Sequence, residues 1–206
     1  MLYYRELLTT DRDAYGIYVQ SPFPKENRRI LIGSDVSSRY TRRNRAEYRK
    51  IAGYIARCVW QRQGNYMVFF PSYRLMEDVL QVYEEEFSVD WVRCVCQTPD
   101  MTEQEREGFL EEFQEREGTL VGFCVLGGIF SEGVDLTGES LIGAVIVGTG
   151  LPQIGSQREI LKEYYDKKNH CGFDYAYRYP GMNKVLQAAG RVIRTKEDLS
   201  LIHISE

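Results

Sequence analysis

The ten residues GNYMVFFPSY, at positions 64–73, contain the clearest fold signal in the chain. A Gly-Asn turn signal comes first, and the run Tyr66 to Phe70 is then apolar without alternation over the length of one β-strand. A strand of this kind is typical of a parallel sheet that helices cover on both faces. Pro71 ends the strand, because proline lacks the backbone donor that a sheet ladder needs.

Strand-like and helix-like segments alternate on both sides of this run. The expected strands are 29–32, 66–70, 91–96, 120–126 and 141–147, with a short apolar run at 201–204 that could be the last one, and the expected helices are 45–61, 75–87, 101–116, 157–168 and 183–194. This alternation predicts an α/β fold with a mainly parallel sheet and helices on both faces. Functional residues of such folds lie on loops beyond the carboxyl ends of the strands.

The chain has 206 residues, of which 43% are hydrophobic and 27% charged, enough for one sizeable core. Its net charge of −4 argues against binding of nucleic acid through overall positive charge, so any such contact has to be local. Residues 25–50 nevertheless hold nine basic and three acidic side chains, a net +6. This segment either contacts nucleic acid or is an ordinary solvated surface. Residues 100–117, with eight acids, favour the solvated face of a helix.

The five cysteines form no CxxC pair. Cys94, Cys96 and Cys124 lie in strand-like apolar runs, where cysteine behaves as a small hydrophobic residue, so we expect neither a metal site nor a disulfide framework. The sequence contains no apolar run of about 18 residues and no secretory pattern. We therefore expect no membrane contact and a cytoplasmic location.

Three strand-end loops carry the candidate chemistry, and the first of them is Phe70 to Tyr73. Ser72 places a hydroxyl just past a strand, where it can bind a phosphate of nucleic acid. The same hydroxyl could instead cap the following helix.

The second loop, residues 127–135, follows an apolar strand and contains three glycines, one serine and two acidic residues. Glycines let the backbone approach a phosphate or ribose, and a carboxylate can accept a hydrogen bond from a hydroxyl. An ordinary glycine-rich turn would explain the pattern equally well.

The third segment is a helix in which Gln187, Arg191 and Arg194 are spaced at i, i+4 and i+7, so that all three project from one face. Two guanidinium groups and an amide suit a polyphosphate, since arginine offers a planar fork of donors. Gly190 allows another backbone to approach closely. The alternative is a solvated basic helix end, where positive charge offsets the helix dipole.

These loops, in this order, resemble the second lobe of superfamily 2 DNA helicases of the DinG and XPD type. Residues 64–73 resemble helicase motif IV, residues 127–135 motif V, and residues 187–194 motif VI. Ser21 to Pro24 and Tyr40 to Arg43 also resemble this family, so the similarity covers nearly the whole chain. The resemblance implies a RecA-like domain of the P-loop NTPase type.

The resemblance also implies a split site, in which ATP and Mg²⁺ lie between two lobes. Arg191 and Arg194 would approach the γ-phosphate as arginine fingers, and Gln187 would help to position them. The resemblance also implies that four more residues lie on the nucleotide side: Glu132, Gly133, Asp135 and Gly190. It implies that Ser72, Tyr73 and Gly128 lie near single-stranded DNA.

The chain lacks the parts expected of a first lobe, because neither GxxxxGK[ST] nor Asp-Glu-x-His occurs in it. We therefore expect residues 1–24 to be a linker from an upstream lobe. Residues 25–206 would form the second lobe and continue beyond Glu206 in the natural protein. ATP and Mg²⁺ would be shared with the first lobe in cis, and the chain alone would bind no metal and be inactive.

Two other functions stay open on the sequence. A non-catalytic RecA-like module could bind nucleic acid or a partner protein, although a scaffold has no need of phosphate-facing arginines. A small-molecule enzyme on the same fold has little support, since His170 and His203 are the only histidines and no nucleophile, base and orienting residue come together.

Overall fold

The chain folds into two compact units in a computed structural model, which describes residues 2–9, 11, 15, 17, 19–114, 118–130, 136, 140–192 and 200–205. The helical unit consists of residues 1–22 and 151–183, and the sheet unit of residues 23–150 and 184–206. All predicted loop motifs belong to the sheet unit.

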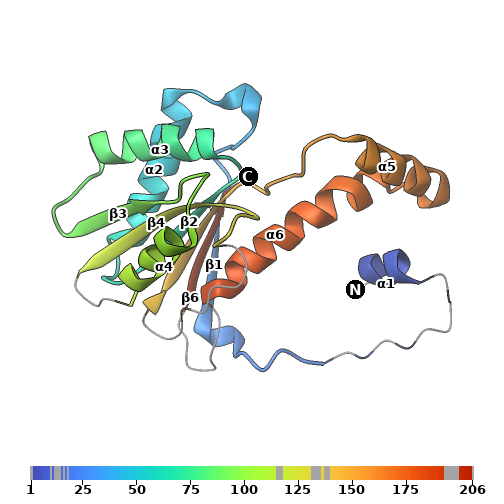
Figure 1. The fold of residues 1–206 in the computed structure, drawn as a ribbon, viewed down its shortest axis with the longest axis horizontal. Coiled ribbons are helices and arrows are strands. Elements are labelled where there is room, and N and C mark those ends of the chain that lie inside the picture. The colour runs from blue at the N-terminus through green and yellow to red at the C-terminus, as the bar shows by residue number, and fades with distance from the viewer. Residues whose placement is uncertain are drawn as a thin grey trace. The chain divides into compact units, whose positions relative to one another are not determined.

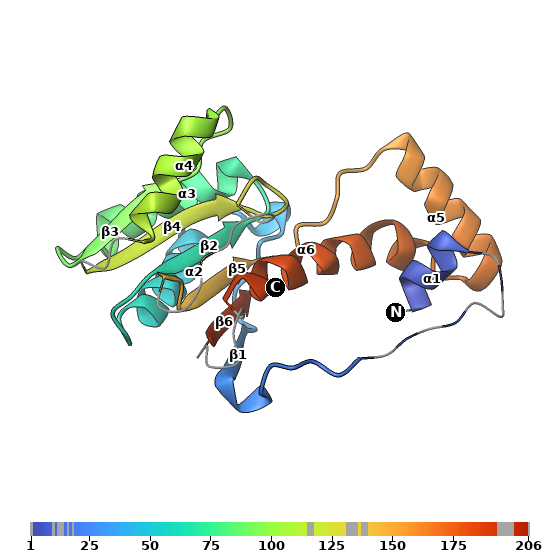
Figure 2. The same cartoon turned by 60° about the horizontal axis from the view of Figure 1, so that its bottom comes forward.

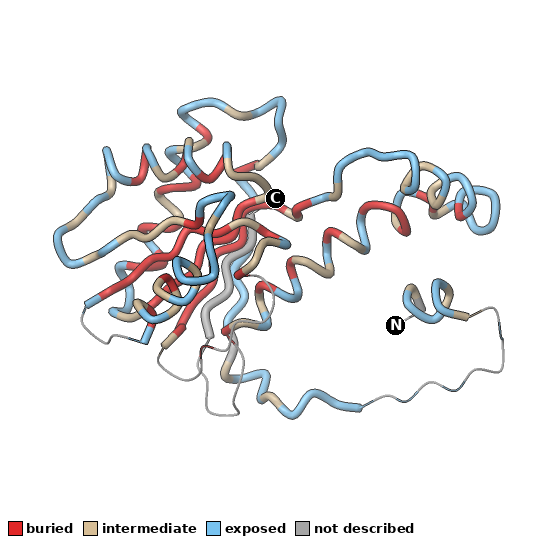
Figure 3. Tube along the Cα trace, viewed as in Figure 1, coloured by how far each residue is buried: buried red, intermediate tan, exposed pale blue. Residues whose placement is uncertain are grey.

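The described residues of the sheet unit form six strands in the order β1-β6-β5-β2-β4-β3, and all neighbouring strands are parallel (Figures 1 and 2). The strands are β1 (Arg28–Gly33), β2 (Tyr66–Phe70), β3 (Val92–Cys96), β4 (Thr119–Val125), β5 (Gly143–Val147) and β6 (Ser200–Ser205). β2 is buried along its whole length, as Figure 3 shows for the centre of the sheet. The α/β fold with a parallel sheet is therefore confirmed.

Helices cover both faces of this sheet. They are α2 (Arg45–Val59), α3 (Tyr73–Glu86), α4 (Glu103–Glu112) and the C-terminal part of α6 (Tyr179–Ala189), with the short turns η1 (Lys25–Asn27), η2 (Tyr40–Arg42) and η5 (Gly190–Val192). α2 and α3 pack on the face that carries Phe70, and α4 and α6 pack on the face that carries Phe69. Alternate residues of β2 thus point into two separate cores, as the period of a strand requires.

The chain leaves two neighbouring strands in opposite directions. α3 follows β2 and lies on one face, whereas α6, the next sheet-unit helix after β5, lies on the other. β2 and β5 are hydrogen-bonded neighbours. The carboxyl ends of β2 and β5 therefore form a topological switch point, which is where open parallel sheets bind their ligands.

The helical unit is built from α1 (Leu2–Leu8), α5 (Ser156–Asn169), the π-helix η4 (Asp174–Arg178) and the start of α6. The rings of Tyr165 and Tyr175 stack with their centroids 3.8 Å apart. The hydroxyl of Tyr175 donates to a carboxylate oxygen of Glu6 at 2.6 Å, which attaches α1 to this cluster.

The ends of several elements differ from the sequence prediction. α4 stops at Glu112 rather than at 116, and α6 starts at Tyr179 rather than at 183, while its predicted end at 194 lies outside the described residues. The sequence does not predict α1, because residues 2–8 lack a clean apolar period. The expected boundary at residue 24 stays a prediction.

Candidate functional site

Three chain segments meet at the switch point between β2 and β5. Gly148, directly after β5, has φ +77°, in the left-handed region that favours glycine. A Cβ atom at this position would lie 2.2 Å from Oγ of Ser38 and 3.9 Å from Cγ of Pro71. The loops that follow β1 and β2 therefore both approach the end of β5, and Ser38 can come so close only because residue 148 has no side chain.

Gln97 connects the motif IV loop with the end of β4. Its side chain is only 2% exposed, its Oε1 accepts from the backbone N–H of Val125 at 3.0 Å, and its Nε2 donates to the hydroxyl of Tyr73 at 2.8 Å. Burial raises the pKa of Tyr73, so this hydroxyl stays protonated at neutral pH. The sequence analysis missed Gln97, although it directly follows the predicted strand 91–96, at the edge where functional residues are expected.

The start of the motif V loop lies against the same glutamine. A Cβ atom at Gly128 would lie 2.9 Å from Nε2 of Gln97, so a larger residue would displace that amide. Tyr73 and Gly128, both predicted near single-stranded DNA, therefore flank Gln97 at one sheet edge. Glu132, Gly133 and Asp135 lie outside the described residues, and their placement stays a prediction.

Ser72 acts as the cap of α3, which is the alternative that the sequence left open. Its Oγ accepts from the backbone N–H of Leu75 at 3.4 Å. A hydroxyl that accepts in this way keeps its own proton for donation, so capping is compatible with a contact to phosphate.

The motif VI segment is described only in part. Val185, Ala188 and Val192 pack into the core, while Gln187 and Gly190 are exposed. Apart from its chain neighbours, no atom of the described residues lies within 4 Å of a Cβ built at Gly190. Arg191 is partly buried in the turn η5, and Arg194 lies outside the described residues, so the geometry of the two arginines stays a prediction.

A buried carboxylate anchors the Ser37–Arg43 loop, which leads from β1 to α2. Glu47 is 5% exposed, and its carboxylate accepts from the backbone N–H of Ser37 at 2.6 Å and from the guanidinium of Arg42 at 3.3 Å. Nε of Arg43 donates to the carbonyl of Ser38 at 3.3 Å. The loop that touches the switch point is therefore held from within the protein.

Acidic partners neutralise part of the basic segment 25–50. Arg45 pairs with Glu85 and Glu86, and Arg49 pairs with Glu86, on the exposed side of α2 and α3. Exposed pairs of this kind contribute little to stability, but they reduce the positive charge that a phosphate would meet.

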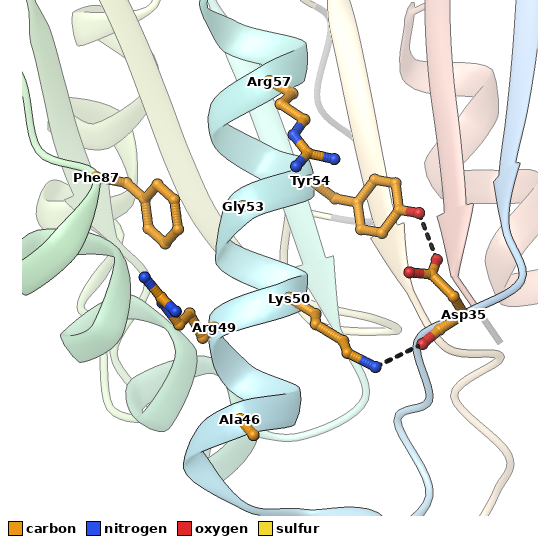
Figure 4. Close-up of a pocket in the computed structure, with 8 residues that line it drawn as sticks. All are labelled: Asp35, Ala46, Arg49, Lys50, Gly53, Tyr54, Arg57 and Phe87. Carbon is orange, nitrogen blue, oxygen red and sulfur yellow. Dashed lines mark hydrogen bonds between the residues drawn. The ribbon is translucent and has the colours of Figure 1, made fainter.

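A pocket of about 540 Å³ lies beside α2 (Figure 4). Within it, Lys50 donates to the carbonyl of Asp35, and the hydroxyl of Tyr54 donates to the Asp35 carboxylate. This hydrogen bond from Tyr54 lowers the pKa of Asp35. None of the predicted site residues that the structure describes lines the pocket, whose lining residues are Asp35, Ala46, Arg49, Lys50, Gly53, Tyr54, Arg57 and Phe87.

All five cysteines are free thiols, and no cluster of metal-ligating side chains is found within the described part of the chain. Burial raises the pKa of Cys94 to about 12 and those of Cys58 and Cys96 to about 11, so these thiols stay protonated at neutral pH. Among the described residues, no helix has the length and apolar character needed to cross a bilayer.

A family model for the helicase C-terminal domain matches residues 55–206. This chain belongs to the helicase C-terminal domain family. The match includes all three predicted motif loops, whereas the basic segment 25–50 lies outside it. It confirms the resemblance to the second lobe of XPD-type helicases.

Relatives of this helicase C-terminal domain are longer proteins. It is 27% identical to a probable ATP-dependent helicase of Methanocaldococcus jannaschii, over 92% of this chain and 30% of that protein. It is 28% identical to the ATP-dependent DNA helicase XPD of Sulfolobus acidocaldarius, over 81% of this chain and 29% of that protein. The fold matches a solved XPD helicase structure with a TM-score of 0.69 and 24% identity, over 87% of this chain and 31% of that one.

Proposed function

We propose that this chain is the second motor lobe of an ATP-dependent DNA helicase, with residues 25–206 as the lobe and residues 1–24 as the segment leading in from a first lobe. Membership of the helicase C-terminal domain family carries the proposal. The chain spans less than a third of its named helicase relatives, in keeping with a motor whose other lobe lies elsewhere in a longer protein.

The nucleotide would bind between this lobe and a first lobe that supplies the phosphate loop. ATP supplies the phosphoryl group whose transfer to water drives movement, with Mg²⁺ balancing its charge. Arg191 and Arg194 would stabilise the charge that develops on the phosphate oxygens, and Gln187 would position them. The exposure of Gln187 and of Gly190 supports this role, because both can be approached by another surface. Glu132, Gly133 and Asp135 would link the nucleotide state to the grip on DNA.

Single-stranded DNA would cross the carboxyl edge of the sheet near Ser72, Tyr73 and Gly128. The Gln97 amide supports this assignment, since it holds Tyr73 and lies against Gly128. A shift in the motif V loop would thereby reach the motif IV loop through one buried side chain.

ATP hydrolysis by the full-length protein tests the motor. We expect DNA-stimulated turnover, a loss of kcat on the order of 10³-fold or more in Arg191→Ala and in Arg194→Ala, and retained binding of single-stranded DNA in both variants. Arg57→Ala on α2 is the control and should keep wild-type turnover.

The isolated chain should hydrolyse no ATP. Turnover by the isolated chain, or full activity of both arginine variants, would overturn the motor assignment. A full-length protein that binds DNA and lacks ATP hydrolysis would instead support the non-catalytic module.

A further inference from the structure

The Ser37–Arg43 loop lies at the same switch point as the motif IV loop. Ser38 and Pro71 both border the position of a Cβ at Gly148, and Ser72 directly follows Pro71. The loop is therefore placed at the sheet edge where a ligand is expected from topology alone.

Tyr40 is an exposed aromatic residue in this loop, and the guanidinium group of Arg43 lies over its ring. It is 79% exposed, and Cζ of Arg43 lies 5.5 Å from the ring centroid. Arg43 is itself fixed by its hydrogen bond to the carbonyl of Ser38. The ring is thus oriented while most of it stays in solvent, which lowers the entropy cost of stacking on a ligand.

Two arginines close to Tyr40 in the sequence have no acidic partner among the described residues. Among the described residues, Arg39 and Arg43 form no ion pair, whereas Arg42, Arg45 and Arg49 each pair with a glutamate. Glu47, the nearest buried carboxylate, is occupied by Ser37 and Arg42. The loop therefore carries an exposed aromatic ring together with two arginines, one of them directly beside the ring, whose guanidinium groups are available to phosphates.

We propose that the Ser37–Arg43 loop binds single-stranded nucleic acid, with the Tyr40 ring stacked on one base and with Arg39 and Arg43 on adjacent phosphates. An unpaired strand fits this surface because its bases can turn a face toward the ring, whereas the bases of a duplex are already stacked. The inference rests on the proposed function, since it adds a contact to the nucleic-acid edge at Ser72.

Binding of a fluorescein-labelled oligodeoxythymidylate to the 206-residue chain, followed by fluorescence anisotropy, tests the inference. Tyr40→Ala should weaken binding roughly five- to hundredfold, as expected for one lost stacking contact, and Tyr40→Phe should restore it. Arg43→Ala should also weaken binding and reduce the salt dependence of log Kd by about 0.7, the value for one phosphate contact on a single strand.

Arg57→Ala provides a matched control, because Arg57 makes a similar contact, 5.9 Å from the Tyr54 ring, on α2. It should leave binding unchanged. Circular dichroism of each variant checks folding, which the exposed Tyr40 side chain should not affect.

The inference would be overturned if Tyr40→Ala left binding unchanged, or if Arg43→Ala and Arg57→Ala weakened it equally. Tighter binding of a duplex of the same sequence would overturn it too. Absence of binding by the wild-type chain would overturn it as well. The motor assignment is judged separately, by ATP hydrolysis of the full-length protein.

Discussion

The side chain of Gln97 joins Tyr73 of the motif IV loop and Gly128 of the motif V loop. These two residues are 55 positions apart in the sequence. The Gln97 amide both accepts and donates, so it satisfies the backbone of β4 and the hydroxyl of Tyr73 at once. A hydrophobic residue of similar size could fill the same volume but could form neither hydrogen bond. The polar character of position 97 therefore matters more than its volume.

We predict that Gln97→Leu lowers the free energy of unfolding by about 1–3 kcal/mol, because the backbone N–H of Val125 and the hydroxyl of Tyr73 lose the hydrogen bonds that the buried amide provides. Urea denaturation measures the change. Gln81→Leu is the control, since Gln81 is exposed and its amide donates to the exposed carboxylate of Glu85, and its effect should stay within about 0.5 kcal/mol. Equal stabilities of the two variants would refute the role of the buried amide.

The elements of the sheet unit were predictable because their signals are local. β2 is apolar along its length, and α2 carries apolar residues at helical spacing, so each can be recognised within its own residues. The motif loops were also found, since they directly follow strands. Tyr40 to Arg43 was noticed only through the family resemblance. The position of the Ser37–Arg43 loop at the sheet edge was not predictable, because its shape depends on a buried carboxylate in α2 and on a glycine after β5.

Gly148 determines how β5 ends beside that loop. We predict that Gly148→Ala destabilises the protein by about 1–2 kcal/mol for the left-handed backbone alone, and by more through its close contact with Ser38. Gly108→Ala should have the opposite sign and stabilise by about 0.5–1 kcal/mol, because Gly108 lies inside α4 and, helix backbone aside, no atom of the described residues is within 4 Å of its Cβ position. Denaturation midpoints of both variants give the comparison, and a neutral Gly148→Ala would disprove the close approach.

Each of the two units of the molecule is built from segments that lie far apart in the sequence. Residues 1–22 pack with residues 151–183, and the sheet unit is completed only by β6 near the end of the chain. No local pattern predicts such a pairing, because the signals of α1 and of the tyrosine cluster are separated by the complete set of strands from β1 to β5. The helical unit therefore forms only after most of the chain is available.

The Glu6 carboxylate is one of the points at which α1 is attached to that unit, together with the backbone carbonyl of Glu6 and the ring of Tyr3. It accepts from the hydroxyl of Tyr175, whose pKa is raised by burial and by Glu6, so the donor stays protonated at neutral pH. We predict that Tyr175→Phe lowers the hydrogen-exchange protection of the backbone amides of residues 6–9 roughly tenfold or more, the effect of losing one hydrogen bond to a charged group. Tyr164→Phe, which changes an exposed ring on α5, should leave these amides unaffected. Similar protection in both variants would mean that ring packing, rather than the bond to Glu6, holds α1.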